Sequence, residues 1–113
     1  MNPLPLVFHL DFDGTPYRRL LSGPPETSAM KAGAVELGPG ETVGEHTTEG
    51  REECVVVLEG EGRFLLAGGA ELPLRAGTLV YCPPETTHNV LNTGQVPLRY
   101  VYIVAKACLP DED

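Results

Sequence analysis

The sequence predicts an all-β fold, an antiparallel barrel or sandwich, and two observations support this prediction. Short runs rich in β-branched and aromatic residues recur about every 8–12 residues, and each run is bounded by glycine or proline. The chain of 113 residues also holds 13 glycines and 11 prolines, which suit tight turns better than a helical bundle. No segment shows helical periodicity, and the length allows one domain with one modest core.

The expected elements follow one another along the chain. Residues 1–28 are expected to form a short N-terminal arm that packs on the barrel or swaps with a partner's, and "PLVFHL" and "YRRLLSG" are its strand-like pieces. Residues 29–107 are expected to form the barrel, with strands in "MKAGAVELGPG", "EECVVVLEG", "GRFLLAGG", "AELPLRAG", "GTLVYCPP", "HNVLNTG" and "PLRYVYIVAKA". Residues 108–113 are expected to form a solvated acidic tail.

Charge and composition exclude several classes of partner. Eight basic residues are scattered among sixteen acidic ones, and the net charge is −8, so neither nucleic acid nor an anionic membrane surface is an expected partner. The N-terminal stretch "MNPLPLVFHLDFDG" does not read as a signal peptide, and no run approaches the roughly 20 apolar residues of a membrane span. Cys54, Cys82 and Cys108 have no paired spacing, which favours reduced thiols, each small and buried, in a cytoplasmic protein.

Two histidines have surroundings that suggest chemistry. His46 precedes Glu53 and an apolar run, and His88 follows a Pro-Pro turn at the start of a predicted strand. If these side chains face the interior, two neutral imidazoles and one carboxylate form the ligand set of open non-haem metal sites. The third histidine, His9, lies in the arm with no chemical partner nearby in the sequence, and we expect it to be structural.

The stretch around His46 resembles the first motif of the cupin family: glycine, five residues, His-x-His, three or four residues, glutamate, six residues, glycine. It is matched by Gly40, His46, Glu53 and Gly60, with Thr48 where the second histidine belongs. The six-residue spacing to Gly60 selects Glu53 over its neighbour Glu52, which is then expected to be a solvated or edge residue.

The stretch around His88 resembles the second cupin motif: glycine, five residues, Pro-x-Gly, two residues, histidine, three residues, asparagine. It is matched by Gly77, Pro83, His88 and Asn92, with Glu85 in place of the inner glycine. Asn92 is expected to hydrogen-bond backbone in the turn that follows. Together the motifs cover residues 40–92, and the chain is identified as similar to the small single-domain cupins of the Cupin 2 conserved-barrel type.

This resemblance implies an antiparallel double-stranded β-helix, the cupin or jelly-roll barrel, and a homodimer. It also implies one divalent transition metal (Fe, Mn, Ni, Zn or Cu) held by His46, Glu53 and His88, with Thr48 beside the open position. Both imidazoles must be neutral to bind, so acid should release the metal near a pKa of about 6.5.

The missing second histidine leaves an alternative open. In this alternative the metal has been lost, and His46 and His88 bind a polar ligand group or each other. Glu45 and Glu49 are expected to be loop charges, although either could serve as a substitute ligand. Six further side chains are candidates for the pocket lining: Tyr81, Tyr100, Tyr102, Arg63, Arg75 and Arg99.

Three functions are compatible with these residues. The first is a metal-dependent enzyme acting on a small molecule, of the oxygenase, isomerase, decarboxylase or hydrolase-like class. The second is a non-catalytic module that binds or senses a small ligand, with or without metal. The third is an assembly component that uses the arm and an apolar sheet face.

Overall fold

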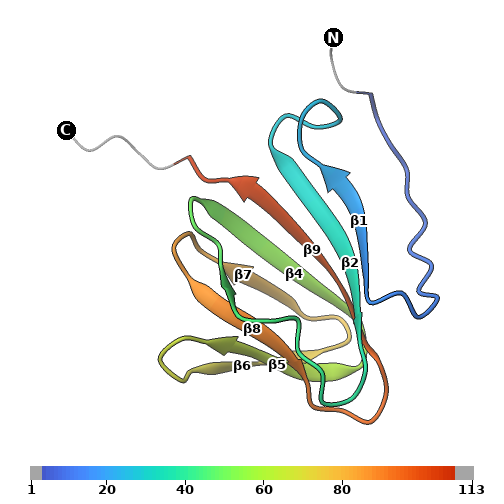
Figure 1. Cartoon of the computed structure of the whole chain (residues 1–113), viewed down its shortest axis with the longest axis vertical. Coiled ribbons are helices and arrows are strands. Elements are labelled where there is room, and N and C mark those ends of the chain that lie inside the picture. The colour runs from blue at the N-terminus through green and yellow to red at the C-terminus, as the bar shows by residue number, and fades with distance from the viewer. Residues whose placement is uncertain (1–3, 109–113) are drawn as a thin grey trace.

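The computed structural model describes residues 4–108, which form nine β-strands and confirm the all-β prediction (Figure 1). The strands are β1 (Tyr17–Ser22), β2 (Met30–Leu37), β3 (His46–Thr47), β4 (Arg51–Glu59), β5 (Glu61–Leu66), β6 (Glu71–Arg75), β7 (Leu79–Cys82), β8 (Thr87–Asn92) and β9 (Leu98–Lys106). Within the described residues no helix is long and apolar enough to cross a membrane.

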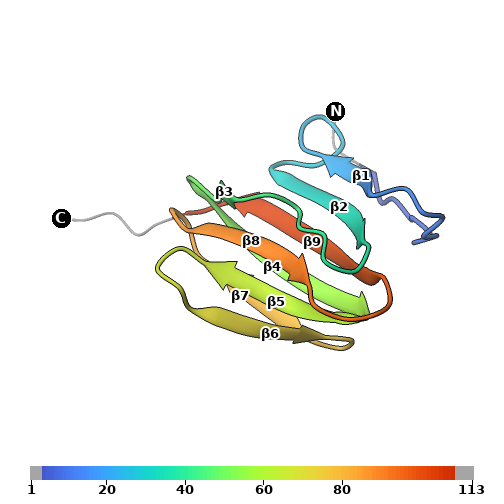
Figure 2. The ribbon, with the colours of Figure 1, turned by 60° about the horizontal axis from the view of Figure 1, so that its bottom comes forward.

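The strands form two antiparallel sheets that face each other, as Figure 2 shows. The five-stranded sheet has the order β1-β2-β9-β4-β7, and the four-stranded sheet has the order β3-β8-β5-β6. Alternate side chains of each strand point between the sheets. The buried core consists of Val35, Leu37, Val55, Val57, Phe64, Leu74, Val80, Cys82, Val90, Leu98 and Tyr100.

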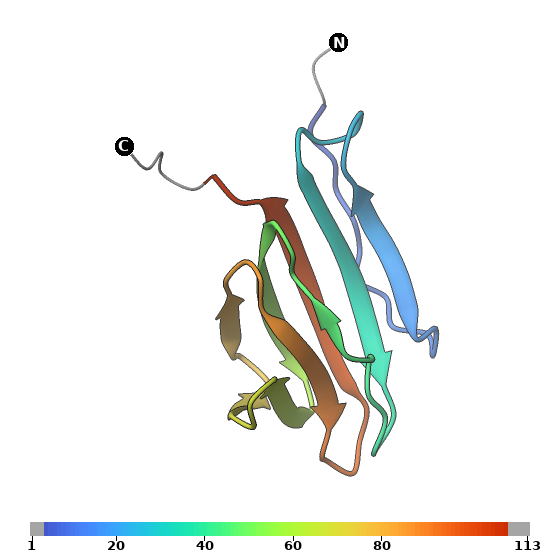
Figure 3. The same ribbon diagram turned by 60° about the vertical axis from the view of Figure 1, so that its left-hand side comes forward.

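The five-stranded sheet is wider than its partner, and β1 and β2 extend beyond the four-stranded sheet in Figures 1 and 2. The inner face of the large sheet is therefore open toward β1. The outer face of β1 and β2 is covered instead by the N-terminal segment, which runs alongside these strands in Figures 1 and 3. Residues 5–10 form no strand, so the prediction of a strand in "PLVFHL" was wrong. Pro5 has no backbone N–H to donate to a neighbouring strand.

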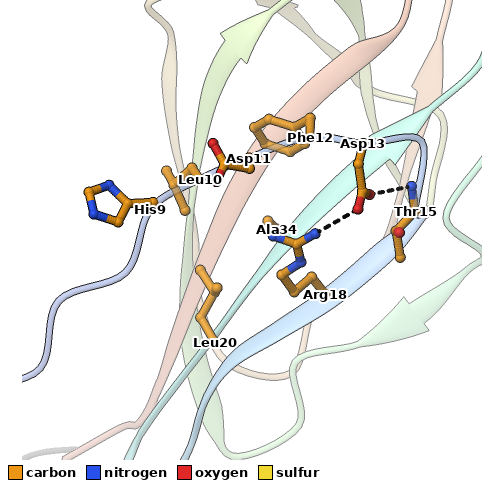
Figure 4. A pocket seen from close by; sticks show the side chains of 9 residues that line it. All are labelled: His9, Leu10, Asp11, Phe12, Asp13, Thr15, Arg18, Leu20 and Ala34. Atoms are coloured by element: carbon orange, nitrogen blue, oxygen red, sulfur yellow. Dashed lines mark hydrogen bonds and ion pairs between the residues drawn. The ribbon is translucent and has the colours of Figure 1, made fainter.

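The N-terminal segment that precedes β1, residues 4–16, is fastened to β1 by polar contacts (Figure 4). The carboxylate of Asp13 accepts a hydrogen bond from the Thr15 backbone N–H at 3.1 Å and pairs with Arg18 at 3.2 Å. Arg99 of β9 lies 5.6 Å from the centre of the Phe12 ring. The division into arm, barrel and tail stays a prediction, and residues 109–113 of the acidic tail lie outside the described residues.

Turns between the strands adopt the backbone conformations expected from the motif residues. Gly40, Gly60 and Gly77 have φ values of 81°, 85° and 89°, in the region that favours glycine. Glu85, which occupies the inner glycine position of the second motif, has a φ of 55° and so keeps the same left-handed conformation. Asn92 donates to the backbone oxygens of Leu37 and Val96, both at 2.9 Å, as predicted.

The three cysteines are free thiols in different environments. Cys82 is buried, Cys54 is half-buried and Cys108 is exposed. The expectation that each would be a buried small residue was therefore wrong for Cys108, which follows the last strand.

Candidate metal centre

The two sheets together bring His46, Glu53 and His88 into one cluster. His46 and His88 face each other in the β3–β8 register, while Glu53 comes from β4 of the opposite sheet. Their nearest ligand atoms all lie within 4.8 Å of one another. His88 and Glu53 are buried, whereas His46 is exposed at the open side of the cluster. The strand predicted around His46 is only two residues long, so Thr48 lies beyond it.

Backbone carbonyls fix the orientation of both imidazole rings. His46 Nδ1 lies 2.8 Å from the Gly44 oxygen, and His88 Nδ1 lies 3.0 Å from the Thr86 oxygen. A carbonyl can only accept, so each Nδ1 carries the proton and each neutral ring keeps its lone pair on Nε2. The tautomer that this contact selects is the one that can bind a metal through Nε2.

The Nε2 atom of His88 is buried and has no hydrogen-bond partner among the described residues. It lies 3.4 Å from Oε1 of Glu53, at ion-pair distance. An orphaned ring nitrogen is unusual, because a buried polar atom without a partner costs about 1–3 kcal/mol. The lone pair of this nitrogen therefore points to a ligand that the protein itself does not supply.

Apolar packing surrounds His88 on its other sides. The Phe64 ring stacks on the imidazole at 5.0 Å, and Cys82 Sγ lies 3.7 Å from Nδ1. Burial lowers the pKa of His88, but the Glu53 carboxylate and the Thr86 carbonyl together raise it above its ordinary value. Burial, with the nearby Glu53 carboxylate, also raises the pKa of the Cys82 thiol to about 11, so this thiol is protonated at neutral pH.

Thr48, which occupies the position of the second motif histidine, ties together the two loops of the site. Its hydroxyl donates to the Pro83 oxygen at 2.7 Å and accepts from the Thr86 N–H at 3.0 Å. The side chain is buried and also lines the cavity described next. Thr48 thus holds the loop before β8, and the Thr86 carbonyl of that loop orients His88.

The cluster opens into a cavity of about 270 Å³ between the sheets. Its apolar wall is formed by valines: Val35, Val43, Val90 and Val104. Tyr17, Tyr100 and Tyr102 contribute hydroxyl groups, and those of Tyr17 and Tyr102 are hydrogen-bonded to each other. Burial is the main cause that raises the pKa of both Tyr100 and Tyr102 above the ordinary value, so both are neutral donors at pH 7.

Tyr17 and Arg51 are among the cavity residues that were not foreseen from the sequence. Tyr17 comes from β1, whose pairing with β2 no local pattern revealed. Arg51 lies two residues before Glu53 on the same strand face, and this spacing was the signal that could have identified it.

The structure places the other sequence candidates away from the cavity. Tyr81 is exposed on the outer face of the large sheet, where its hydroxyl donates to Glu52 at 2.7 Å. Arg99 is paired with Glu36 and Glu59, and Arg63 lies 4.0 Å from Glu71. The cavity lining also does not include Glu45, Glu49, Arg75 or His9, and His9 lies in the arm (Figure 4).

The cluster fits a divalent transition metal. Bonds of about 2.1 Å at right angles separate two ligand atoms by about 3 Å, close to the 3.4 Å between His88 Nε2 and Glu53 Oε1. Two imidazole nitrogens and one carboxylate are a donor set for Fe, Mn, Ni, Zn or Cu, and they do not choose among these ions.

Comparison with known proteins identifies the family. The Cupin_2 profile, described as a cupin domain, matches residues 33–104, which is more than half of the chain. The chain is 33% identical over 70 residues to the oxalate-binding protein of Thermotoga maritima, covering 62% of this chain and 57% of that protein. It is 39% identical over 62 residues to the glucose-6-phosphate isomerase of Pyrococcus abyssi, covering 51% of this chain and 33% of the isomerase. The alignments thus span a third to somewhat over half of these relatives.

Solved structures show the same fold. A structure described as a predicted oxalate decarboxylase from Thermotoga maritima has a TM-score of 0.74 and 28% identity, covering 80% of this chain and 79% of that one. A Cupin 2 conserved barrel domain protein from Salinispora arenicola has a TM-score of 0.71 and 25% identity, covering 95% and 90% of the two chains. The chain therefore belongs to the cupin family and has the double-stranded β-helix fold.

Proposed function

We propose that this cupin binds one divalent transition metal through His46, Glu53 and His88. The observation that carries the proposal is the buried Nε2 lone pair of His88, which has no partner among the described residues. The same tautomer is set in His46 by the Gly44 carbonyl, and the Glu53 carboxylate lies opposite both rings. Three protein ligands leave positions open for water and for a bidentate small molecule.

We further propose that the protein is a metal-dependent enzyme acting on a small molecule, of the oxygenase, isomerase or decarboxylase class. A bound metal would supply Lewis acidity and a fixed point for the substrate. Four valines give the cavity an apolar wall, and the neutral hydroxyls of Tyr100 and Tyr102 can donate hydrogen bonds to a substrate oxygen. Relatives named as an oxalate-binding protein and as glucose-6-phosphate isomerases support a small polar ligand.

A non-catalytic binding module is the second candidate, and the tie made by Thr48 favours it. The hydroxyl that replaces a fourth ligand is already committed to Pro83 and Thr86, so the site has one protein ligand fewer than the full motif provides. Turnover of any substrate by the metal-loaded protein distinguishes the enzyme from this module.

Metal content tests the proposed centre. Protein purified without chelator and then supplied with each candidate metal should hold about one ion per chain. His88→Ala should lose it, and the matched control His9→Ala, which alters a histidine of the arm, should keep it. Equal metal content in His88→Ala and the wild type, or none in the wild type after supplementation, would exclude the centre and leave the metal-free module.

We also propose a cytoplasmic homodimer. Free thiols support the location. Exposed apolar side chains support the dimer: Leu79 and Tyr81 lie on β7 at the edge of the large sheet, and Leu4 and Val7 of the arm are 76% and 86% exposed. A second copy would cover these surfaces. Light scattering should give twice the 12.1 kDa chain mass, and a monomer mass at micromolar concentration would refute the dimer.

A further inference from the structure

Half of the eight basic residues of this acidic chain gather at one end of the large sheet. Arg51 lies opposite Lys106 in the β4–β9 register, and Lys31 lies opposite Val104 in the β2–β9 register. Arg19 lies opposite Gly33, which in turn lies opposite Tyr102. Tyr102 and Val104 line the cavity, so strand alternation puts all four cations on the same inner face, beside the open side of the cavity.

These four cations differ in their ion pairing from three of the other four basic residues. Arg18, Arg63 and Arg99 each make an ion pair, whereas Arg75 makes none within residues 4–108. None of Arg19, Lys31, Arg51 and Lys106 makes an ion pair or a side-chain hydrogen bond to another residue in this range. Two like charges directly opposite each other on neighbouring strands are unfavourable unless an anion lies between them.

Arg51 connects this group to the proposed metal centre. It lines the cavity that holds the cluster, and it also lines an adjoining hollow of about 260 Å³ together with Glu49, Gly50 and Lys106. Arg51 is two residues from Glu53 on the same face of β4, a separation of about 7 Å along the strand. The Glu49 carboxylate is the acidic group of the hollow, and it will oppose an anion there.

We propose that the ligand of this cavity is a small organic anion with two polar ends. One end is a chelating hydroxycarboxylate or equivalent at His46, Glu53 and His88, and the other is a carboxylate or phosphate, held by Arg51 and Lys106. Lys31 and Arg19 add positive potential behind this pair. The chelating end rests on the proposed metal centre, whereas the contact with Arg51 and Lys106 rests on the cation arrangement alone.

Matched ligands test the charged end. Calorimetry on the manganese-loaded protein at low salt compares L-malate with 2-hydroxybutyrate, which has the same chelating end and a methyl group in place of the second carboxylate. A second comparison, 3-phosphoglycerate against glycerate, separates phosphate from carboxylate recognition. L-malate and 3-phosphoglycerate are called the charged ligands below, because each carries a second anionic group that 2-hydroxybutyrate or glycerate lacks. The wild type should bind at least one of them about 20-fold more tightly than its counterpart without that group, because two exposed charge contacts contribute about 5-fold each.

Variants then locate the charged end. Arg51→Gln/Lys106→Gln should abolish this preference, with the manganese affinity unchanged within about 2-fold. Arg75→Gln, which removes an exposed cation of the other sheet that has no ion pair among the described residues, should keep it. Glu49→Gln should strengthen binding of the charged ligand several-fold, because it removes the opposing carboxylate. Thermal unfolding confirms that each variant is folded.

The outcomes separate this proposal from the proposed metal centre. The proposal is wrong if the double variant keeps the full preference for the charged ligand. It is also wrong if the wild type shows no such preference, or if it binds none of the four compounds up to about 10 mM. If the wild type binds no metal, the metal centre fails on its own. The same ligand comparison in metal-free protein then tests the contact with Arg51 and Lys106. The preference for the charged ligand should remain there, although the affinities for both ligands of each pair fall.

Discussion

Replacing Thr48 by valine should destabilise the metal-free protein by about 2 kcal/mol. Valine has nearly the same shape but removes both hydrogen bonds of the hydroxyl, at 2.7 Å to Pro83 and 3.0 Å from Thr86. The orphaned Thr86 N–H costs about 2 kcal/mol and the Pro83 carbonyl, which lies in an exposed residue, about 1 kcal/mol, while the added methyl group recovers about 1 kcal/mol.

Urea unfolding of the apoprotein measures this difference without dependence on any metal. A loss of 2 kcal/mol corresponds to a fall in the midpoint of about 1 M or more. Thr48→Ser keeps both hydrogen bonds and should lose only about 1 kcal/mol. Thr47→Val is the matched control, because the neighbouring threonine is exposed, and it should change stability by less than about 0.5 kcal/mol. If Thr48→Val were no less stable than Thr47→Val, the hydrogen bonds of Thr48 to the two loops would make no measurable contribution to stability.

Three further outcomes are expected. Gly62→Ala should lower the free energy of unfolding by more than about 3 kcal/mol, because the new Cβ would lie 2.2 Å from a backbone oxygen of β8. Gly50→Ala is the control: its Cβ meets nothing within 4 Å, so it should be nearly neutral, and equal effects of the two variants would contradict the close packing at Gly62. Glu85→Gly should stay within about 0.5 kcal/mol of the wild type, whereas Glu85→Val should cost about 1–2 kcal/mol at a φ of 55°, and the reverse order would exclude the left-handed backbone. With its pKa raised to about 11, the Cys82 thiol is ionised at pH 8 in only about one molecule in a thousand. A disulfide reagent should therefore label the exposed Cys108 first and Cys82 only on unfolding, and early labelling of Cys82 would show that it is not buried.

The strand segments of the barrel and the cluster of His46, Glu53 and His88 followed from short-range information, whereas the order of the strands in the two sheets did not. Strand rhythm located the strands of the barrel, and the motif spacings placed each of the three side chains on an inward position of its strand. A spacing carries this information because successive side chains of a strand alternate between its two faces.

The rest of the site depends on pairings that no spacing contains. Tyr17 enters the cavity because β1 pairs with β2 in a particular register, and a change of one residue would turn it outward. The commitment of the Thr48 hydroxyl to Pro83 and Thr86 depends on the approach of two loops 35 or more residues apart. Loop approach is a three-dimensional property, and a single sequence does not encode it locally.

The position of β1 has a thermodynamic consequence for the whole molecule. One face of this edge strand presents Tyr17 to the cavity, and the other is joined to the N-terminal segment, residues 4–16, through Arg18 and Asp13. A ligand that contacts Tyr17 binds only molecules in which β1 is docked, so ligand binding and β1 docking stabilise each other by equal free energies. Amide hydrogens of β1 and β2 should therefore exchange more slowly when the cavity is filled, and removing the N-terminal segment should weaken a ligand that this segment does not contact.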